Sequence, residues 1–272
     1  MITDISLAQS LREICQQAGK AILAVYQRDD VGLQTKADDS PVTEADLTAD
    51  RCIREGLQAL TPEIPVLSEE SDIVPWAERS GWKCYWLVDP LDGTREFVDR
   101  TDEFTVNIAL IENGVSILGV IYAPVNGVCY MGGRDTGGAW RQCDKTEPVQ
   151  LTTRPCAPEG IMNVAVSRRH GENTIPTLMQ RFEHRFGEVH VTTAGSSLKA
   201  CLVAEGLVDI YPRRGPTSEW DTAAAQSIVE AAGGRVLDPD LKPLRYNSKE
   251  SLLNPDFTVV GDPSVNWENL LL

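Results

Sequence analysis

The stretch DPLDGT, residues 89–94, carries the strongest chemical signal in the chain. Two carboxylates, Asp89 and Asp92, stand three positions apart, where a predicted apolar strand ends in a cluster of turn-forming residues. Carboxylate oxygens and a backbone carbonyl, here that of Leu91, are the hard ligands that Mg²⁺ prefers. The amides of Gly93 and Thr94 are placed to hold a phosphate, as turn amides do. An ordinary surface turn uses the same residues, so spacing alone leaves both interpretations open.

Three further acidic residues carry weaker signals. Glu69 lies in an irregular acidic stretch just before that strand, where a solvated surface is the ordinary interpretation. Asp46 has the capping-box spacing with Thr43, which predicts a helix start. Asp221 lies at the start of another predicted helix, where an N-cap is the ordinary role. One metal-dependent reaction would use all three together with the two aspartates of DPLDGT.

Composition narrows the class of protein. The formal charge of −15 over 272 residues argues against general binding of nucleic acid or anionic membranes, and it is compatible with a carboxylate cation site. Seven cysteines without a C-x-x-C pair indicate free thiols in a reducing compartment. Three histidines without an H-E-x-x-H motif give little support to zinc. No signal peptide and no bilayer-length apolar stretch is visible, so we expect a soluble cytoplasmic protein.

The elements that must position these residues divide at about residue 145. In residues 1–145, apolar periodicity predicts a helix over 4–27 and a second helix from Thr43, with Leu47, Ile53, Leu57 and Leu60 on one face. Strands follow over 84–89, 104–111 and 115–123, the last two as a hairpin. In residues 146–272, strands alternate with helices. We therefore expect an α+β half and an α/β half, fused with a cleft between them.

At this point the sequence resembles the inositol monophosphatase superfamily of Mg²⁺-dependent, Li⁺-sensitive phosphatases. Its first motif, D-P-L/I-D-G-T-x-x-F, stands at 89–97, and its second, W-D-x-A-A, stands at 220–224. SPVTEAD, with Asp46, and LSEES, with Glu69, precede them in the expected order. The resemblance covers nearly the whole chain. It implies a layered α-β-α-β-α sugar-phosphatase-like fold with the metal site in the cleft between the two halves.

The resemblance also implies site roles and two or three Mg²⁺ ions. Glu69, Asp89 and the Leu91 carbonyl would bind the first metal; Asp89, Asp92 and Asp221 the second; Glu69, helped by Asp46 through water, the third. Asp46 and Thr94 would orient and deprotonate the attacking water. Phosphoryl transfer needs mainly positioning and charge neutralisation, which agrees with these roles.

Within the superfamily the resemblance is closest to the 3′(2′),5′-bisphosphate nucleotidases, on phrases such as YWLVDPLDGTREF and AGSSLKACLVAEG. It implies hydrolysis of adenosine 3′,5′-bisphosphate to AMP and phosphate, and also of its sulfated analogue, which recycles a by-product of sulfate assimilation. Ser196, Lys199, Arg213 and His170 would contact the nucleotide or its 5′-phosphate. For Lys199 an ordinary surface lysine, and for His170 a satisfied loop residue, are the alternatives.

Two other functions stay open. A phosphatase of the same family could act on an inositol or sugar phosphate. A non-catalytic metal or nucleotide sensor could use the same scaffold, although every expected ligand is present in this chain. The resemblance favours a monomer over a homodimer, and loose attachment to the inner face of the cell membrane also stays open.

Overall fold

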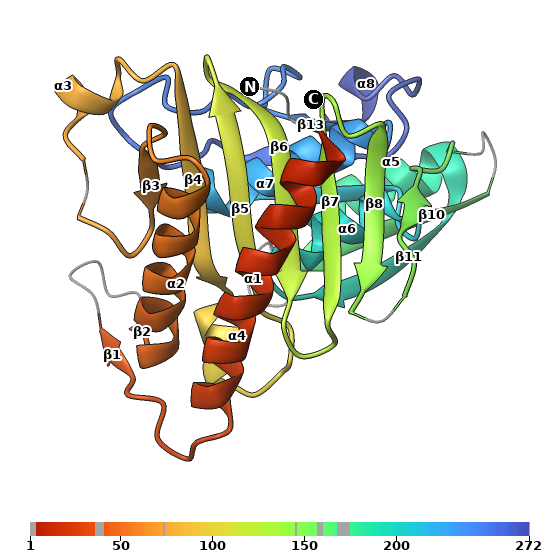
Figure 1. The fold of residues 1–272 in the computed structure, drawn as a ribbon. Helices are drawn as coiled ribbons and strands as arrows, with labels where there is room; N and C mark the ends of the chain where they lie inside the picture. Colours follow the sequence, from red (N-terminus) through yellow and green to blue (C-terminus); the bar gives the residue numbers. More distant parts are fainter. Residues whose placement is uncertain are drawn as a thin grey trace.

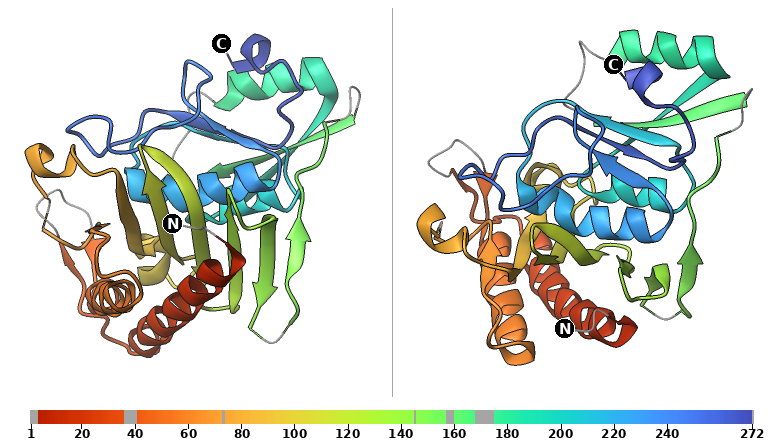
Figure 2. Two further views of the ribbon diagram at one scale, coloured as in Figure 1. Left: turned by 45° about the horizontal axis from the view of Figure 1, so that its top comes forward. Right: turned by 90° about the horizontal axis from the view of Figure 1, so that it is seen from above.

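The chain folds into five layers in which helices cover both faces of two β-sheets (Figure 1; Figure 2). The computed structural model describes residues 4–35, 41–72, 74–144, 146–156, 160–167 and 175–271. Outer helices on the first sheet are α1 (Ile5–Tyr26) and α2 (Glu44–Leu60); α6 (Leu198–Ala204) and α7 (Glu219–Ala231) lie between the sheets; α5 (Ile175–Phe186) and α8 (Glu268–Leu271) lie outside the second sheet. This order confirms the α-β-α-β-α fold that the resemblance implied.

The first sheet has seven strands in the order β3-β4-β5-β6-β7-β8-β9. They are β3 (Val66–Ser68), β4 (Cys84–Asp92), β5 (Thr105–Glu112), β6 (Val115–Ala123), β7 (Val128–Gly133), β8 (Gly138–Cys143) and β9 (Val149–Leu151). Neighbours are antiparallel except β3 and β4. The sheet continues past residue 145, and the division there remains a prediction.

The predicted strand over 84–89 continues through the DPLDGT motif, and its pairing with β5 is interrupted there. Asp89 pairs with Asn107 and Asp92 pairs with Thr105, with a shift of register between the two pairs. Such an irregularity bends the strand and changes the direction of its side chains. The shift therefore redirects the chain between the two carboxylates that the sequence singled out. The short helix α4 (Thr94–Val98) follows directly.

The second sheet has five strands in the order β11-β10-β12-β14-β13. They are β10 (Gly160–Ser167), β11 (Gly187–Ala194), β12 (Ile210–Arg213), β13 (Arg235–Leu237) and β14 (Phe257–Val260). Strand β10 is parallel to β11 and β12, as the predicted strand–helix alternation requires. A separate two-stranded sheet joins β1 (Gln34–Thr35) and β2 (Pro41–Val42), and the short helix α3 (Trp76–Arg79) precedes β4.

The two outer helices differ in how well their buried faces were predicted. The apolar stripe of α1 is buried, as expected. In α2 the buried stripe is Ala45, Ala49, Ile53 and Leu57, whereas Leu47 and Leu60 are 46% and 36% exposed, so their predicted place on the buried face is wrong. Leu47 stands two positions from Ala45 and from Ala49, on the far side of the helix. Leu60 is the last helical residue.

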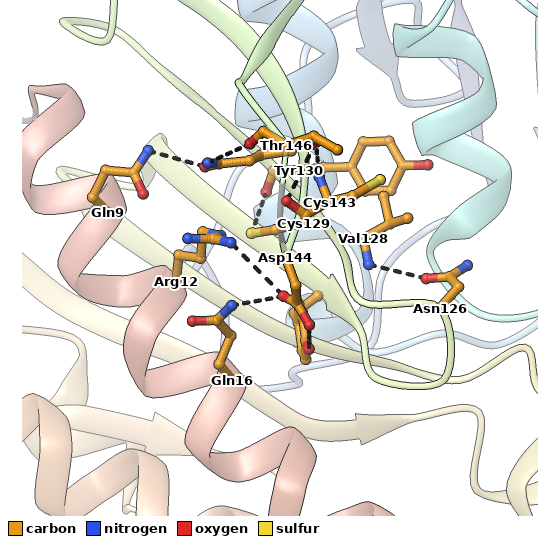
Figure 3. A network of polar contacts seen from close by, with 12 residues as sticks. Gln9, Arg12, Gln16, Asn126, Val128, Cys129, Tyr130, Cys143, Asp144 and Thr146 are labelled. Carbon is orange, nitrogen blue, oxygen red and sulfur yellow. Dashed lines mark hydrogen bonds and ion pairs between the residues drawn. The ribbon is translucent and has the colours of Figure 1, made fainter.

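Polar contacts fix α1 against the end of strand β8 of the first sheet (Figure 3). The Asp144 carboxylate accepts a hydrogen bond from Gln16 Nε2 at 2.7 Å and forms an ion pair with Arg12 at 3.7 Å. Gln9 Nε2 donates to the Gln142 side chain at 3.3 Å. These contacts join the N-terminal helix to the end of β8, beside the expected boundary between the two halves.

Helix α7 lies directly against the first sheet, and this contact fixes where the helix begins. A Cβ atom at Gly119 of β6 would lie 2.1 Å from the Ala224 carbonyl oxygen, and one at Gly132 of β7 would lie 2.9 Å from Ile228 Cα. Helix backbone therefore lies where side chains of the sheet would otherwise project. Asp221, in the first turn of α7, is held at a fixed place relative to β4 and β5.

Among the described residues, no helix is both long enough and apolar enough to cross a bilayer.

Candidate active site

A cavity of about 500 Å³ opens where β4 ends and where α6 and α7 begin. Nearly all the site residues predicted from the sequence line it: Glu69, Asp89, Leu91, Asp92, Gly93, Thr94, Ser196, Lys199, Arg213 and Asp221. Asp46 does not line the cavity but reaches it through Thr94. His170 lies outside the described residues. The structure thus brings together residues that are up to 152 positions apart, counted from Glu69 to Asp221.

Asp46 caps α2 and also points one oxygen toward the cavity. Its Oδ2 atom accepts hydrogen bonds from the Thr43 amide at 2.7 Å and the Thr43 hydroxyl at 2.6 Å, which confirms the predicted capping box. Its Oδ1 atom accepts from the Thr94 hydroxyl at 3.1 Å. Burial raises the pKa of Asp46, although these hydrogen bonds oppose the shift. A buried carboxylate with a raised pKa is a better proton acceptor than an exposed one.

Asp89 is a strongly perturbed acid of the site. Burial raises its pKa well above the ordinary value, and the negative charges of Glu69, Asp92 and Asp221 raise it further. Its Oδ1 atom accepts from the Leu91 amide at 3.1 Å, so the motif folds back on its own carboxylate. Several carboxylates that disfavour one another's ionisation are typical of a site completed by cations.

Asp92 is oriented by two residues that the sequence did not single out. The Ser197 hydroxyl donates to Asp92 Oδ2 at 2.6 Å, and Asn107 Nδ2 donates to the same oxygen at 3.2 Å. Asn107 also donates to the Ser197 oxygen at 2.9 Å. Asn107 is a polar residue within the apolar run FTVNIALI, and that was the available signal. The hydrogen bonds among Asp92, Asn107 and Ser197 connect the first sheet to the start of α6.

Asp221 belongs to a second capping box, at the start of α7. Its Oδ2 atom accepts from the Ser218 amide at 2.9 Å. Asp221 is therefore the third residue of the helix and not its N-cap, so that part of the ordinary interpretation is wrong. Burial raises its pKa well above the usual range, helped by the charges of Asp92 and Glu69.

The acids fit hard cations in type, although they do not form a finished ligand set. Within the described ranges, no three acidic, cysteine or histidine side chains converge closely enough to hold a metal ion. The aspartates instead accept hydrogen bonds from Thr43, Ser197 and Ser218. The oxygen-only donor set suits Mg²⁺ better than zinc.

One part of the cavity wall is basic. Lys199 is 5% exposed, and its Nζ atom donates to the carbonyls of Ser196 at 2.6 Å and Ala194 at 3.2 Å. It also lies 5.4 Å from the centre of the Tyr211 ring. Burial lowers the pKa of Lys199 to about 8. The surface-lysine alternative is therefore wrong, because this ammonium group is enclosed.

Two further donors on this wall are buried without a partner in the part of the chain that the structure describes. They are Arg213 Nε and Ser196 Oγ. Arg213 Nη2 meanwhile donates to the Pro216 carbonyl at 3.2 Å, which fixes the direction of the guanidinium group. Buried donors normally have an acceptor, so unpartnered ones that line a cavity favour an anionic ligand there.

Comparisons with known proteins agree with this geometry. The model of the inositol monophosphatase family matches residues 6–268. The 3′(2′),5′-bisphosphate nucleotidase CysQ of Escherichia coli is 48% identical over 254 residues, 92% of this chain and 98% of that protein. A crystal structure of CysQ from Bacteroides thetaiotaomicron, 38% identical, superimposes with a TM-score of 0.80 over 95% of this chain and 98% of that one. The IMPase of Thermotoga maritima, 24% identical, shares the fold with a TM-score of 0.73 over 92% and 90%.

Proposed function

This chain belongs to the inositol monophosphatase family, and from that membership we propose that it is a magnesium-dependent 3′(2′),5′-bisphosphate nucleotidase. Its reaction is the removal of the 3′-phosphate from adenosine 3′,5′-bisphosphate, which gives AMP and phosphate. The observation that carries the proposal is that one cavity is lined both by a carboxylate cluster, called here the carboxylate end, and by Lys199 and Arg213, called here the basic end. A substrate with two phosphates has a group for each end. The names of the relatives at 48% and 38% identity support the same activity.

The carboxylate end would hold two or three Mg²⁺ ions. The raised pKa values of Asp89 and Asp221 support this: burial raises both, neighbouring carboxylates add to the shift, and cations would offset that repulsion. The bound ions would neutralise phosphate charge and activate water. The residues that would hold them are Glu69, Asp89, the Leu91 carbonyl, Asp92 and Asp221, with Asp46 acting through water.

Asp46 and Thr94 would prepare the attacking water. The Thr94 hydroxyl lies 3.1 Å from Asp46 Oδ1 and 3.4 Å from the Leu91 carbonyl. A water beside Thr94 would give its proton to the Asp46 carboxylate, directly or through the Thr94 hydroxyl. The raised pKa of Asp46 favours that transfer, and Thr43 keeps the second carboxylate oxygen fixed.

The basic end would hold the phosphate that is not cleaved. Arg213 Nε and Ser196 Oγ have no other partner in the described residues, and Lys199 Nζ uses only two carbonyls. An ammonium group carries three N–H donors, which leaves one for a phosphate oxygen. A bound phosphate would also stabilise the charged form of Lys199. Gly93 and Thr94 also line the cavity and would lie beside the scissile phosphate.

We extend the proposal to the sulfated analogue as a second substrate and to a role in recycling a by-product of sulfate assimilation. We also propose that the enzyme is a cytoplasmic monomer. All seven cysteines are free, as is usual in a reducing compartment.

A phosphate-release panel tests the function. The purified chain is given adenosine 3′,5′-bisphosphate, its sulfated analogue, myo-inositol 1-phosphate and AMP, each with Mg²⁺, with EDTA and with Mg²⁺ plus Li⁺. We expect Mg²⁺-dependent release from the first two, and inhibition by Li⁺.

The alternatives give different panels. Faster release from myo-inositol 1-phosphate would favour an inositol phosphatase and contradict the nucleotidase. Nucleotide or metal binding without release from any substrate would favour a sensor.

A further inference from the structure

Residues 247–254, which we name the collar, wrap the start of α7. The Glu219 amide donates to the Leu252 carbonyl at 2.8 Å. The Asn254 side chain donates to the Ser218 carbonyl at 2.6 Å, and the Asn254 amide donates to the Thr217 carbonyl at 2.8 Å. Thr217, Ser218 and Glu219, which lead into the helical turn that carries Asp221, are therefore all hydrogen-bonded to the collar. A displacement of the collar would displace Asp221.

Arg79 binds the collar from the other side. It is 1% exposed, although it is an arginine in a short helix near the surface layer. Its Nη1 atom donates to Asn247 Oδ1 at 2.5 Å and its Nη2 atom donates to the Glu250 carbonyl. The Asn247 side chain in turn donates to the Arg79 carbonyl at 2.5 Å. These two reciprocal hydrogen bonds join α3 to the collar. The two segments lie close together in both views of Figure 2.

Glu219 connects the collar to the first turn of α7. It is 1% exposed, and its Oε2 atom accepts from the Asn247 amide at 2.7 Å. Burial raises the pKa of this carboxylate to about 7, and the Asn247 amide and the charge of Arg79 oppose that shift. Arg79 Nε, Tyr85 Oη and Glu219 Oε1 are buried without hydrogen-bond partners among the described residues.

The connection spans two segments that supply candidate metal ligands. Glu69 lies between β3 and α3, and Arg79 ends α3. Asp221 lies in the first turn of α7, two residues after Glu219. Both acids line the same cavity. Hydrogen bonds join Arg79 of α3 to Asn247 of the collar, and Asn247 in turn to Glu219 of α7.

We propose that Arg79, Asn247 and Glu219 form a latch that sets the position of Asp221 at the start of α7 and thereby the affinity of the site for Mg²⁺. This inference rests on the proposed function. The three residues touch no reacting atom, so they are positioning residues. Groups that orient metal ligands commonly change metal affinity when they are removed.

Asn247→Gly is the sharpest variant, because Asn247 has a positive φ of 49° that glycine adopts without strain. The change removes both side-chain bonds to Arg79 and keeps the backbone bond to Glu219. We expect the Mg²⁺ dissociation constant from isothermal titration calorimetry to rise about 10-fold. The Mg²⁺ concentration for half-maximal phosphate release should rise in parallel, while kcat at saturating Mg²⁺ stays close to that of the parent.

Arg154→Met is the matched control. Arg154 binds Asp209 through two hydrogen bonds at 2.6 and 2.7 Å, near the far end of α7, where the Thr153 amide meets the Ala232 carbonyl. Its loss should lower Tm and leave the Mg²⁺ dissociation constant unchanged. An Asn247→Gly protein with lowered Tm but the Mg²⁺ constant of the parent would overturn the latch.

Arg79→Lys gives an independent measurement if Asn247→Gly does not fold. Lysine keeps the charge but lacks the fork that spans Asn247 and the collar, so the same rise in the Mg²⁺ constant is expected. An Arg79→Lys enzyme with the parent's Mg²⁺ constant would overturn the proposal. A parent chain that binds Mg²⁺ but releases no phosphate would overturn the proposed function and not the latch.

Discussion

Two charge clusters of opposite sign line the cavity, and they are built in different ways. At the acidic end (Glu69, Asp89, Asp92, Asp221), Asp221 sits in the first turn of a capped helix, and burial, followed by the negative charges of neighbouring acids, raises the pKa values of Asp89 and Asp221. At the basic end (Ser196, Lys199, Arg213), side chains rest on backbone carbonyls, and burial lowers the pKa of Lys199 to about 8. Both ends shift groups toward their neutral forms.

The difference teaches that each end requires a ligand of the other sign, but for different steps. Cations at the acidic end would take part in the chemistry. A phosphate at the basic end would only be held, so its loss should affect one class of substrate more than another. Variants at the two ends therefore separate reaction from recognition.

The largest effect is expected at the acidic end, for Asp92→Asn. Losing a metal ligand removes several kcal/mol of transition-state stabilisation, which lowers kcat about 1,000-fold or more. The same change removes one of the charges that disfavour ionisation of Asp89, so Tm in EDTA should rise. Phosphate release and thermal unfolding of the same preparation measure both effects. Turnover close to that of the parent at saturating Mg²⁺ would remove Asp92 from the ligand set.

The next effect in size concerns Asp46, beside the same end. Asp46→Asn keeps an oxygen for the cap and removes the proton acceptor, so kcat should fall about 100-fold or more. The Mg²⁺ dependence should change little. Recovery of activity with additional Mg²⁺ would instead make Asp46 a metal ligand. A loss of about 1 kcal/mol in the free energy of unfolding, with normal kcat, would leave only the capping role.

At the basic end, Lys199→Ala should act on one substrate class. Losing a charge-assisted phosphate contact costs about 1.5–3 kcal/mol, or roughly 10- to 150-fold in kcat/KM, for a nucleotide with two phosphates. A substrate with only the scissile phosphate should lose little. The measurement is kcat/KM of the parent and of the variant on each of the two substrates. Equal losses on both substrates would contradict the role of Lys199 in recognition.

The smallest effect is a pH dependence of the basic end. Burial lowers the pKa of Lys199 to about 8, so above this pH the ammonium group loses its proton. The ratio of kcat/KM for the bisphosphate to that for a monophosphate should therefore fall as pH rises through about 8. A ratio that stays flat to pH 9 would contradict the assignment.

The same group changes stability in the opposite direction. The unfolded chain keeps its proton up to the ordinary lysine pKa of 10.5. Between about pH 8 and 10.5 the unfolded state binds more protons than the folded state, so the contribution of Lys199 to the free energy of unfolding rises with pH. Above about pH 8, activity toward the bisphosphate should therefore fall while the contribution of Lys199 to the free energy of unfolding rises.

Local patterns in the sequence predicted much of the acidic end. The capping box of Thr43 and Asp46 depends on residues three positions apart, and DPLDGT ends its own strand, so both are encoded locally. The resemblance supplied the rest of that site by motif. The structure places these residues together at one cavity, and their catalytic and metal-binding roles remain predictions.

The parts that sequence analysis missed depend on contacts between distant segments. Asn107 and Ser197 meet across 90 positions, and Arg79 and Asn247 meet across 168. Nothing in the neighbourhood of Arg79 distinguishes it from a solvated arginine, because its partners lie in the collar. The buried face of α2 was mispredicted for a related reason: small alanines pack there, and a larger leucine faces water.

The contact of α7 with Gly119 and Gly132 has a consequence for how such a chain can change over generations. A larger residue at either position would push the helix and move Asp221 with it. The Leu253 side chain also lines the cavity, but it is 52% exposed and is not packed between the helix and the sheet. Mutations should therefore accumulate on the walls long before they are tolerated beneath the helix. Descendants of one ancestor could in this way come to accept different phosphate esters while the support of the reacting end stays the same.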